Sequence, residues 1–520
     1  ERDVLRLEAL GVDTAADRSL LSGLRARAGS RSEALEAIEQ ALAEDPHQAA
    51  DWLSYAQLLN EEGEAGKAHQ AVERCLELDR QSGEAWGLLA TLLSPHANRA
   101  KEALKAATHA VALDAGGTDL IFLKSDLQHS EGLITAGEET LEKALLKDPA
   151  NAELRARMAG RKLLESDLDA AQKLLDETPF GIDHALLHVV EGRLHLALCD
   201  RARDGTGKTD AVLLADAVAS FEGALKLNRE LGVAWLGLAR TKRLLNDLEG
   251  ASEDIDRAIR LLPDQDPSAS AEAALLAIEN KDLSTATKHI DVADVHGNAV
   301  TVSYVRGNIA LQRGQFEDAL GHYTSALNSG PNHIRARLNR CSVLMALNQS
   351  KKALDDAQIL VDLAPALILA RLRRGEALMQ LGEWEQARDD LKIALDASPH
   401  HYQALTKLAS CYMALERPER AEAPLNEAIR LQSDYAPAWH QRGIMYLDIN
   451  RNENALDDFQ SAVRCDGSHL DSRLRIAAIY HQTERFDQAE QAWRAVLALN
   501  PDHIVARTRL TECETQLLKS

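Results

Sequence analysis

Residues 436–469 read APAWHQRGIMYLDINRNENALDDFQSAVRCDGSH, and this stretch of 34 residues decides the fold. Gly443 at its eighth position and Ala455 at its twentieth are small, so two helices can cross closely there, where larger side chains would overpack the contact. Asn450 lies between them, near position 15, and is a residue type that ends helices. The stretch therefore predicts two antiparallel helices joined by a short turn.

The same spacing extends over most of the chain. Five prolines, which end helices, are separated by 68, 34, 34 and 102 residues, all multiples of 34: Pro263, Pro331, Pro365, Pro399 and Pro501. A fixed period of this length indicates a repeat architecture rather than three or four independent domains. Cutting on that period gives fourteen repeats, which start near Ala15, Ala49, Gly83, Thr118, Ala152, Ala185, Gly232, Asp266, Val300, Ile334, Ile368, Tyr402, Ala436 and Leu470.

Small residues hold both crossing positions in almost every repeat. The eighth residue is small in all fourteen: Ser22, Ala56, Ala90, Ser125, Ala159, Gly192, Ala239, Ala273, Gly307, Cys341, Gly375, Ala409, Gly443 and Ala477. The twentieth, allowing for a one-residue slip in two repeats and an insertion in the sixth, is alanine in all but the fourth, where Gly137 stands. Every repeat is therefore expected to form the same helix pair.

The repeats resemble the tetratricopeptide repeat (TPR) throughout residues 15–503. The thirteenth carries the family pattern of Trp, Gly, Tyr, Ala, Phe and Ala nearly in full, at Trp439, Gly443, Tyr446, Ala455, Phe459 and Ala462. The resemblance implies an all-α fold, a right-handed α-solenoid of about fourteen helix-turn-helix repeats in which each repeat contacts mainly its neighbours. It also implies that the large pattern residues are core and that residues 504–520 form a capping helix.

The regular spacing fails in one zone. Pro179-Phe180-Gly181 cuts the fifth repeat short, and the sixth carries about 13 extra residues before Ala217. An array is least cooperative where packing between repeats is interrupted, so a loop insertion and a hinge are expected there. The predicted organisation is an N-terminal segment or partial helix at 1–14, a TPR array at 15–175, an irregular zone at 176–216, a second array at 217–503 and the capping helix.

Composition and charge narrow the possible partners. The chain is 45% hydrophobic and only 4% aromatic, which suits helices and disfavours a large antiparallel β protein. Its 59 basic and 81 acidic residues give a net charge of −22, which argues against a general affinity for nucleic acid or an anionic membrane. Six widely spaced cysteines without a CxxC pair favour a reducing compartment.

The sequence also bears on localisation. It contains no apolar run of the ~18 residues that a transmembrane helix needs. The chain begins at Glu1 without a signal-like start, so we expect a processed, trimmed or partial chain. A soluble, cytoplasmic protein is the first expectation, and a periplasmic or membrane-anchored protein whose anchor preceded Glu1 is the alternative.

Two stretches of the irregular zone imitate chemical sites. Residues 202–209 meet a loose phosphate-loop pattern, but a phosphate loop needs a buried strand before it, so a flexible loop is expected instead. A stripe along one helix face could chelate zinc, although its members fall in slots that other repeats use for packing: His184, His188, Glu191 and His195. We predict no cofactor, and this stripe is the only metal candidate.

A peptide-binding groove is predicted in repeats nine to eleven. Asn308, Asn339 and Arg373 fall at inner-face positions and resemble part of the two-carboxylate clamp of chaperone-binding TPR co-chaperones. Amide and guanidinium groups donate charge-assisted hydrogen bonds to carboxylates, so the expected ligand carries an acidic segment or C-terminus. The clamp's two lysines are expected where Tyr304 and Leu369 stand. The predicted groove comprises Asn308, Asn339, Arg335, Arg373, Tyr304 and Leu369.

Arginines cluster around this groove, against the sign of the whole chain: Arg335, Arg337, Arg340, Arg371 and Arg374. They would give the groove a local positive potential. The alternative is that the arginines at positions 4 and 7 form inter-repeat pairs with nearby acids such as Asp355, Asp356 and Asp389.

The function predicted from these features is a non-catalytic scaffold or adaptor that binds partner proteins or extended peptides and assembles a complex. No nucleophile elbow or metal-hydrolase motif is present, so we expect no enzymatic activity. One alternative is a regulatory or substrate-recruiting arm of a kinase or glycosyltransferase. Another is a membrane-anchored envelope protein that assembles or exports cargo.

Overall fold

The protein is entirely helical over the residues that its computed structural model describes, which are 14–27, 29–263, 266–295 and 299–518. These residues contain 29 α-helices, two short 3₁₀ helices and no strand. They fall into two compact units. The first ends at Leu194 and includes Lys226–Asn228, and the second comprises His195–Leu225 and Arg229–Ser520. The segment predicted at 1–14 lies outside the described residues except for Thr14.

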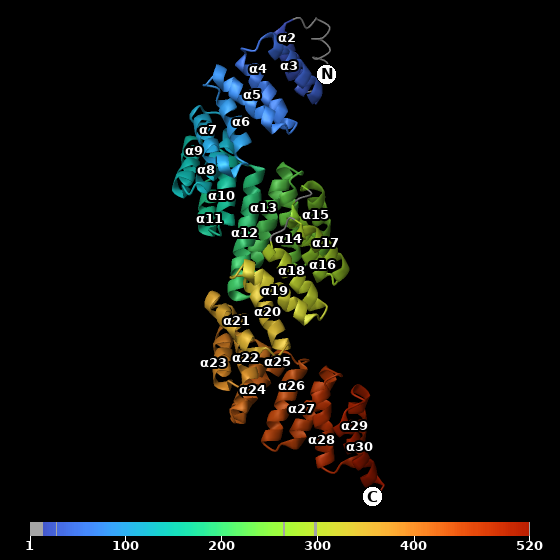
Figure 1. Cartoon of the computed structure of the whole chain (residues 1–520). Coiled ribbons are helices and arrows are strands. Elements are labelled where there is room, and N and C mark those ends of the chain that lie inside the picture. The colour runs from blue at the N-terminus through green and yellow to red at the C-terminus, as the bar shows by residue number, and fades with distance from the viewer. Residues whose placement is uncertain (1–13, 28, 264–265, 296–298, 519–520) are drawn as a thin grey trace. The chain divides into compact units, whose positions relative to one another are not determined.

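The first unit is a series of helix pairs (Figure 1). Its helices are α2 (Ala15–Arg27), α3 (Arg31–Glu44), α4 (Ala49–Glu61), α5 (Ala65–Leu78), α6 (Gly83–Leu93), η1 (Ala97–Arg99), α7 (Ala100–Ala112), α8 (Gly117–Ser130), α9 (Ile134–Lys147), α10 (Ala152–Leu164) and α11 (Leu168–Asp176). The next helix, α12 (Ala185–Thr206), begins in the first unit and ends in the second.

The second unit continues the same arrangement and ends with an additional helix, α30 (Figure 1). After α12 it contains α13 (Ala211–Leu227), α14 (Gly232–Leu244), α15 (Leu248–Leu261), α16 (Pro267–Glu279), α17 (Leu283–Asp294), α18 (Ala299–Gln312), α19 (Phe316–Ser329), α20 (Ile334–Ala346), α21 (Ser350–Leu363), α22 (Ile368–Leu381), α23 (Trp384–Ala397), α24 (Tyr402–Ala414), η2 (Pro418–Arg420), α25 (Glu422–Leu431), α26 (Ala436–Asp448), α27 (Asn452–Cys465), α28 (Leu470–Gln482), α29 (Phe486–Leu499) and α30 (Ile504–Leu517).

The fourteen predicted repeats correspond to fourteen successive helix pairs along the described chain, followed by α30. Eleven of the predicted starts coincide with the first residue of a helix, and the other three differ by one residue. The predicted all-α solenoid of helix-turn-helix repeats is therefore confirmed. No helix within the described ranges combines the length and apolar character required to cross a membrane.

Small residues let the paired helices cross closely, as the sequence predicts. A Cβ atom added to Gly443 on α26 would lie 2.8 Å from the ring of Phe459 on α27, and that ring is fully buried. Gly307 and Tyr323 repeat the arrangement on α18 and α19, at 2.5 Å. Since interiors are packed to crystal-like density, these glycines are required by packing, and the large aromatic residues are core.

The turns between paired helices also follow the sequence. Asn450 has φ of +58° and Gly382 has φ of +82°, the left-handed conformation that closes a helix C-terminus. After Asn450, the amide of Arg451 donates a hydrogen bond to the carbonyl of Tyr446 at 2.8 Å. A carbonyl of the last turn of α26, which would otherwise be unpaired, therefore has a partner.

The insertion in the sixth repeat is helical, where the sequence predicts a loop. Its residues extend α12 through Thr206, and only residues 207–210 separate it from α13. Strong helix formers such as Ala197, Arg201 and Ala202 sustain the helix, and its apolar face buries Leu196 and Cys199. Residues 202–206 are thus the last turn of a helix, with no strand before them among the described residues, and the phosphate-loop resemblance has no structural basis.

Candidate protein-binding groove

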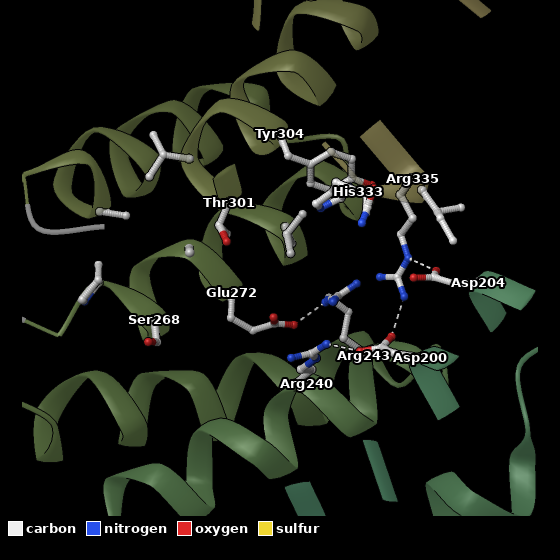
Figure 2. Close-up of a pocket in the computed structure, with 17 residues that line it drawn as sticks. Asp200, Asp204, Arg240, Arg243, Ser268, Glu272, Thr301, Tyr304, His333 and Arg335 are labelled. Carbon is white, nitrogen blue, oxygen red and sulfur yellow. Dashed lines mark hydrogen bonds and ion pairs between the residues drawn. The ribbon is translucent and has the colours of Figure 1, made fainter. Parts of the chain in front are cut away.

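A pocket of about 490 Å³ lies in the second unit among the first helices of repeats six to ten (Figure 2). Helices α12, α14, α16, α18 and α20 all contribute side chains to it. Its walls combine apolar residues such as Leu275, Val302 and Ile334 with a set of charged residues. We call this pocket the groove site.

One wall of the groove site is a partly buried ion-pair network on α14 and α16. The Arg243 guanidinium donates through Nε to Glu272 and through Nη1 to Glu279, both at 2.5 Å. Burial alone would lower the pKa of Arg243, but the two carboxylates outweigh burial and raise it. This wall therefore holds its charges in fixed pairs.

The opposite wall is aromatic and is formed by α18 and the start of α20 (Figure 2). The rings of Tyr304 and His333 lie with their centroids 4.9 Å apart. His333 Nδ1 accepts the amide hydrogen of Ala336 at 3.0 Å, which caps α20. Burial, with a further contribution from Arg335, lowers the pKa of His333, so this ring is neutral at pH 7.

The third side of the groove site is the C-terminal part of α12. Asp200 accepts from Arg335 Nη2 at 2.5 Å and is also paired with Arg240, and Asp204 accepts from Arg335 Nε at 2.9 Å. Burial would raise the pKa of Asp200, but Arg240 and Arg335 outweigh burial and hold it below its ordinary value. Asp200 and Arg335 are 135 positions apart in the chain, so the extension of α12 joins repeat six to repeat ten.

The residues predicted to form the peptide-binding groove occupy three different places. Tyr304 and Arg335 line the groove site. Asn308 and Asn339 lie together: Asn339 Nδ2 donates to Asn308 Oδ1 at 3.0 Å, and the buried Tyr323 hydroxyl donates to the same oxygen at 2.8 Å. The two amides therefore already have partners within the protein.

Arg373 lies further along the same series of first helices. Its Nη1 donates to Glu376 at 2.7 Å, and Glu376 also pairs with Lys407 of α24 at 3.1 Å. Leu369 is 39% exposed at the start of α22. None of these contacts tests the two-carboxylate clamp, which stays a prediction.

The arginines around the predicted groove pair with acids, although the partners differ in part from those expected. Asp356 of α21 accepts from Arg337 at 2.9 Å and from Arg340 at 2.6 and 2.7 Å. Asp390 of α23 pairs in the same way with Arg371 and Arg374. Each acid belongs to the same repeat as its arginines, whereas pairs between repeats were predicted. Of the predicted acids, Asp389 instead pairs with Arg388.

The histidine stripe does not form a ligand cluster. His188 is paired on both ring nitrogens, with Asp183 at 2.8 Å and Glu191 at 3.1 Å, and His184 Nδ1 accepts the amide hydrogen of Leu186. Across the described part of the chain, no three His, Cys, Asp or Glu side chains converge as metal ligands would. The zinc candidate rests on helical spacing alone.

Five charged residues of the groove site are absent from the sequence prediction: Asp200, Asp204, Arg240, Arg243 and Glu272. Arg240 stands at position 9 and Arg243 at position 12 of the seventh repeat, which are inner-face positions, so the repeat phase alone could have identified them. Asp200 and Asp204 lie in the insertion, where the 34-residue phase is lost, and no local signal places them opposite repeat ten.

Comparison with known protein families agrees with this architecture. Tetratricopeptide-repeat family models match residues 25–92, 304–367, 372–436 and 440–504, which together are about half of the chain. The chain belongs to the tetratricopeptide-repeat superfamily, and proteins with this fold generally act as protein-interaction scaffolds. No curated protein sequence matches the chain.

Solved structures also match the chain at low sequence identity. The chain in the crystal structure of the APC/C hetero-tetramer Cut9-Hcn1 is 14% identical, with 98% of each chain covered and a TM-score of 0.55. A tetratricopeptide repeat protein from Parabacteroides merdae is 18% identical over 47% of this chain and 97% of its own, with a TM-score of 0.38. A chain of Naa15/Naa10 bound to HypK-THB is 14% identical over 97% of both, with a TM-score of 0.37.

Proposed function

We propose that this protein is a non-catalytic scaffold that binds an extended segment of a partner protein in the groove site and thereby assembles a multiprotein complex. The observation that carries the proposal is the groove site itself. Five helices from successive repeats converge on one cavity, and its lining combines apolar surface, an aromatic ring and polar side chains. Such a lining suits a peptide, which has apolar side chains and a polar backbone.

Polar groups beyond the ion pairs support peptide binding. Ser268, Thr301 and Asn332 line the cavity with hydroxyl and amide groups. An extended peptide leaves one amide hydrogen and one carbonyl oxygen per residue to be satisfied, and such side chains can satisfy them. Tyr304 adds a flat apolar surface on which a side chain of the partner can pack.

Complex assembly is the second half of the proposal. A repeat array spreads binding over many positions, so a partner segment and further subunits can use different repeats. The Cut9-Hcn1 structure, which is similar in fold, is a hetero-tetramer. On that likeness of fold we extend the same kind of role to this chain.

Blocking the groove site tests the proposal. Thr301→Arg places a long side chain into the cavity, and we expect it to reduce capture of native partners in affinity purification by at least about 10-fold, because a few central contacts dominate such interfaces. Ser325→Arg, at an exposed position of α19, is the matched control and should capture the same partners as the wild type. Equal capture by both variants would refute the groove site as the binding surface.

A further inference from the structure

Ion pairs join the end of α12 to other repeats of the second unit. Between Cys199, which is buried, and Leu214 no residue of this fully described stretch is buried. Gly205 weakens the last turn of the helix, and Gly207, with φ of +77°, ends it. The segment 200–206, which we call the α12 tip, therefore contains no buried side chain.

Four charged side chains hold the α12 tip in place. Asp200 bridges Arg240 and Arg335, and Asp204 adds a second bond to Arg335. These side chains are 23% to 41% exposed, so water and salt reach them. Ion pairs that water reaches contribute less to stability than buried ones, so a helix end without a buried side chain opens at lower cost than the buried parts of the repeats.

We propose that the α12 tip is an intramolecular latch, and that an acidic helical segment of a partner protein displaces it to bind Arg240 and Arg335. This inference rests on the proposed function, because it names the chemistry of the partner that enters the groove site. The tip already has the form of such a ligand: its two carboxylates stand one helical turn apart, on one face, against the guanidinium groups.

Displacement of the tip would uncover a specific recognition surface. Arg335 directs both Nε and Nη2 at the tip, which is the two-donor geometry that suits carboxylates. Arg243 remains paired with Glu272 and Glu279 when the tip leaves. The uncovered charge is therefore that of Arg240 and Arg335, and it selects a segment with Asp or Glu at positions i and i+4.

A peptide that copies the tip provides the probe. A fluorescein-labelled synthetic peptide with the sequence of residues 196–209 is titrated into the full chain by fluorescence polarisation. The Asp200→Asn/Asp204→Asn variant has a latch that no longer competes, so we expect it to bind the peptide at least about 10-fold more tightly than the wild type does. Adding Arg335→Gln to that variant should abolish binding.

Controls distinguish a displaceable latch from an α12 tip that stays in place, and specific from non-specific peptide binding. The same peptide with both aspartates changed to asparagine should bind neither protein. Asp204→Asn alone, which keeps Asp200 between its two arginines, should bind with intermediate affinity and serves if the double variant does not fold by circular dichroism. Equal affinity of wild type and double variant, or equal binding of both peptides, would overturn the latch.

The latch and the proposed function fail in different ways. Loss of partners from Thr301→Arg without any effect in the peptide titration would leave the scaffold function in place and remove the latch. Unchanged partners in Thr301→Arg would remove the groove site whatever the peptide does.

Discussion

Arginine–aspartate pairs occur in two settings in the second unit, and the settings differ in burial and in sequence distance. Within repeats ten and eleven, Asp356 and Asp390 pair with arginines 16 and 19 residues away, and both carboxylates are about 95% buried. At the groove site, Asp200 and Asp204 pair with Arg335 more than 130 residues away and are 23% and 33% exposed.

The same chemistry therefore has two consequences. A buried carboxylate that two arginines share cannot be removed without leaving uncompensated charge in the interior, so those pairs fix the internal geometry of a repeat. A partly exposed pair that closes a long loop of chain contributes less and can open while every repeat remains folded. The repeats give the protein its rigid frame, and the α12 tip gives it a part that can move.

The largest effect is expected at the buried pairs. Asp356→Ala removes the carboxylate that pairs with the guanidinium groups of Arg337 and Arg340. Because it leaves their charge uncompensated, we expect it to lower the free energy of unfolding by about 3 kcal/mol or more. Chemical denaturation followed by circular dichroism measures the loss. The control is Asp355→Ala, one residue earlier and exposed, which should change stability by less than about 0.5 kcal/mol. A similar small change for Asp356→Ala would show that the buried pair contributes no structural constraint.

A smaller loss is expected where the repeat pattern fixes the helix crossing. Gly443→Ala drives a Cβ atom to 2.8 Å from the buried ring of Phe459, so we expect a destabilisation of about 1–3 kcal/mol. Gly321→Ala is the matched change in α19, where an added Cβ atom has no neighbour within 4 Å. It should stabilise the helix by up to about 1 kcal/mol, and the opposite order of the two denaturation midpoints would contradict the packing argument.

These two predictions concern features that the sequence already contains. The helix starts and the tight crossings recur every 34 residues, because each repeat packs the same pair of helices. The period of the sequence therefore predicts them. Three arginine–aspartate pairs have the same spacing of 16 residues: Arg340 with Asp356, Arg374 with Asp390 and Arg442 with Asp458. This spacing could also have been predicted from the sequence.

The groove site could be predicted only in part. Tyr304 and Arg335 were expected in a groove because their repeat positions face inward. The α12 tip was not, since the glycines after Asp204 favour a loop, while the tertiary pairing with Arg335 and Arg240 supports a helix. A contact over 135 residues has no periodic signature, because it depends on how successive repeats stack and not on the content of any one repeat.

A weaker effect on stability is expected from pH, and it should involve a partly buried histidine and not the ion pairs of the α12 tip. Burial, aided by His469 and Arg475 and opposed by Asp471, lowers the pKa of His440 to about 4. The unfolded chain, with an ordinary histidine pKa near 6.5, then binds more protons between these values. Stability is therefore complete above pH 6.5 and falls as the pH falls toward 4.

His440→Gln should accordingly show a smaller drop in melting temperature between pH 7 and pH 5 than the wild type. His400→Gln, on the exposed turn before α24, is the control and should retain the wild-type drop. The ion pairs of the α12 tip should persist across this range, because Arg240 and Arg335 hold the pKa of Asp200 below its ordinary value. A drop that is identical in His440→Gln and wild type would rule out the assignment to His440.

Hydrogen exchange of the intact protein, measured by mass spectrometry at two salt concentrations, compares the two settings directly. Peptides covering residues 200–206 report on the latch, and peptides covering α21, which carries Asp356, report on the frame. We expect the α12 tip to exchange at least about 100-fold faster than α21 in 0.05 M NaCl and faster still in 1 M NaCl, since salt screens pairs that water reaches more than it screens buried pairs. A salt-independent rate would indicate ordinary fraying, and protection equal to that of α21 would show that the tip is a fixed part of the fold.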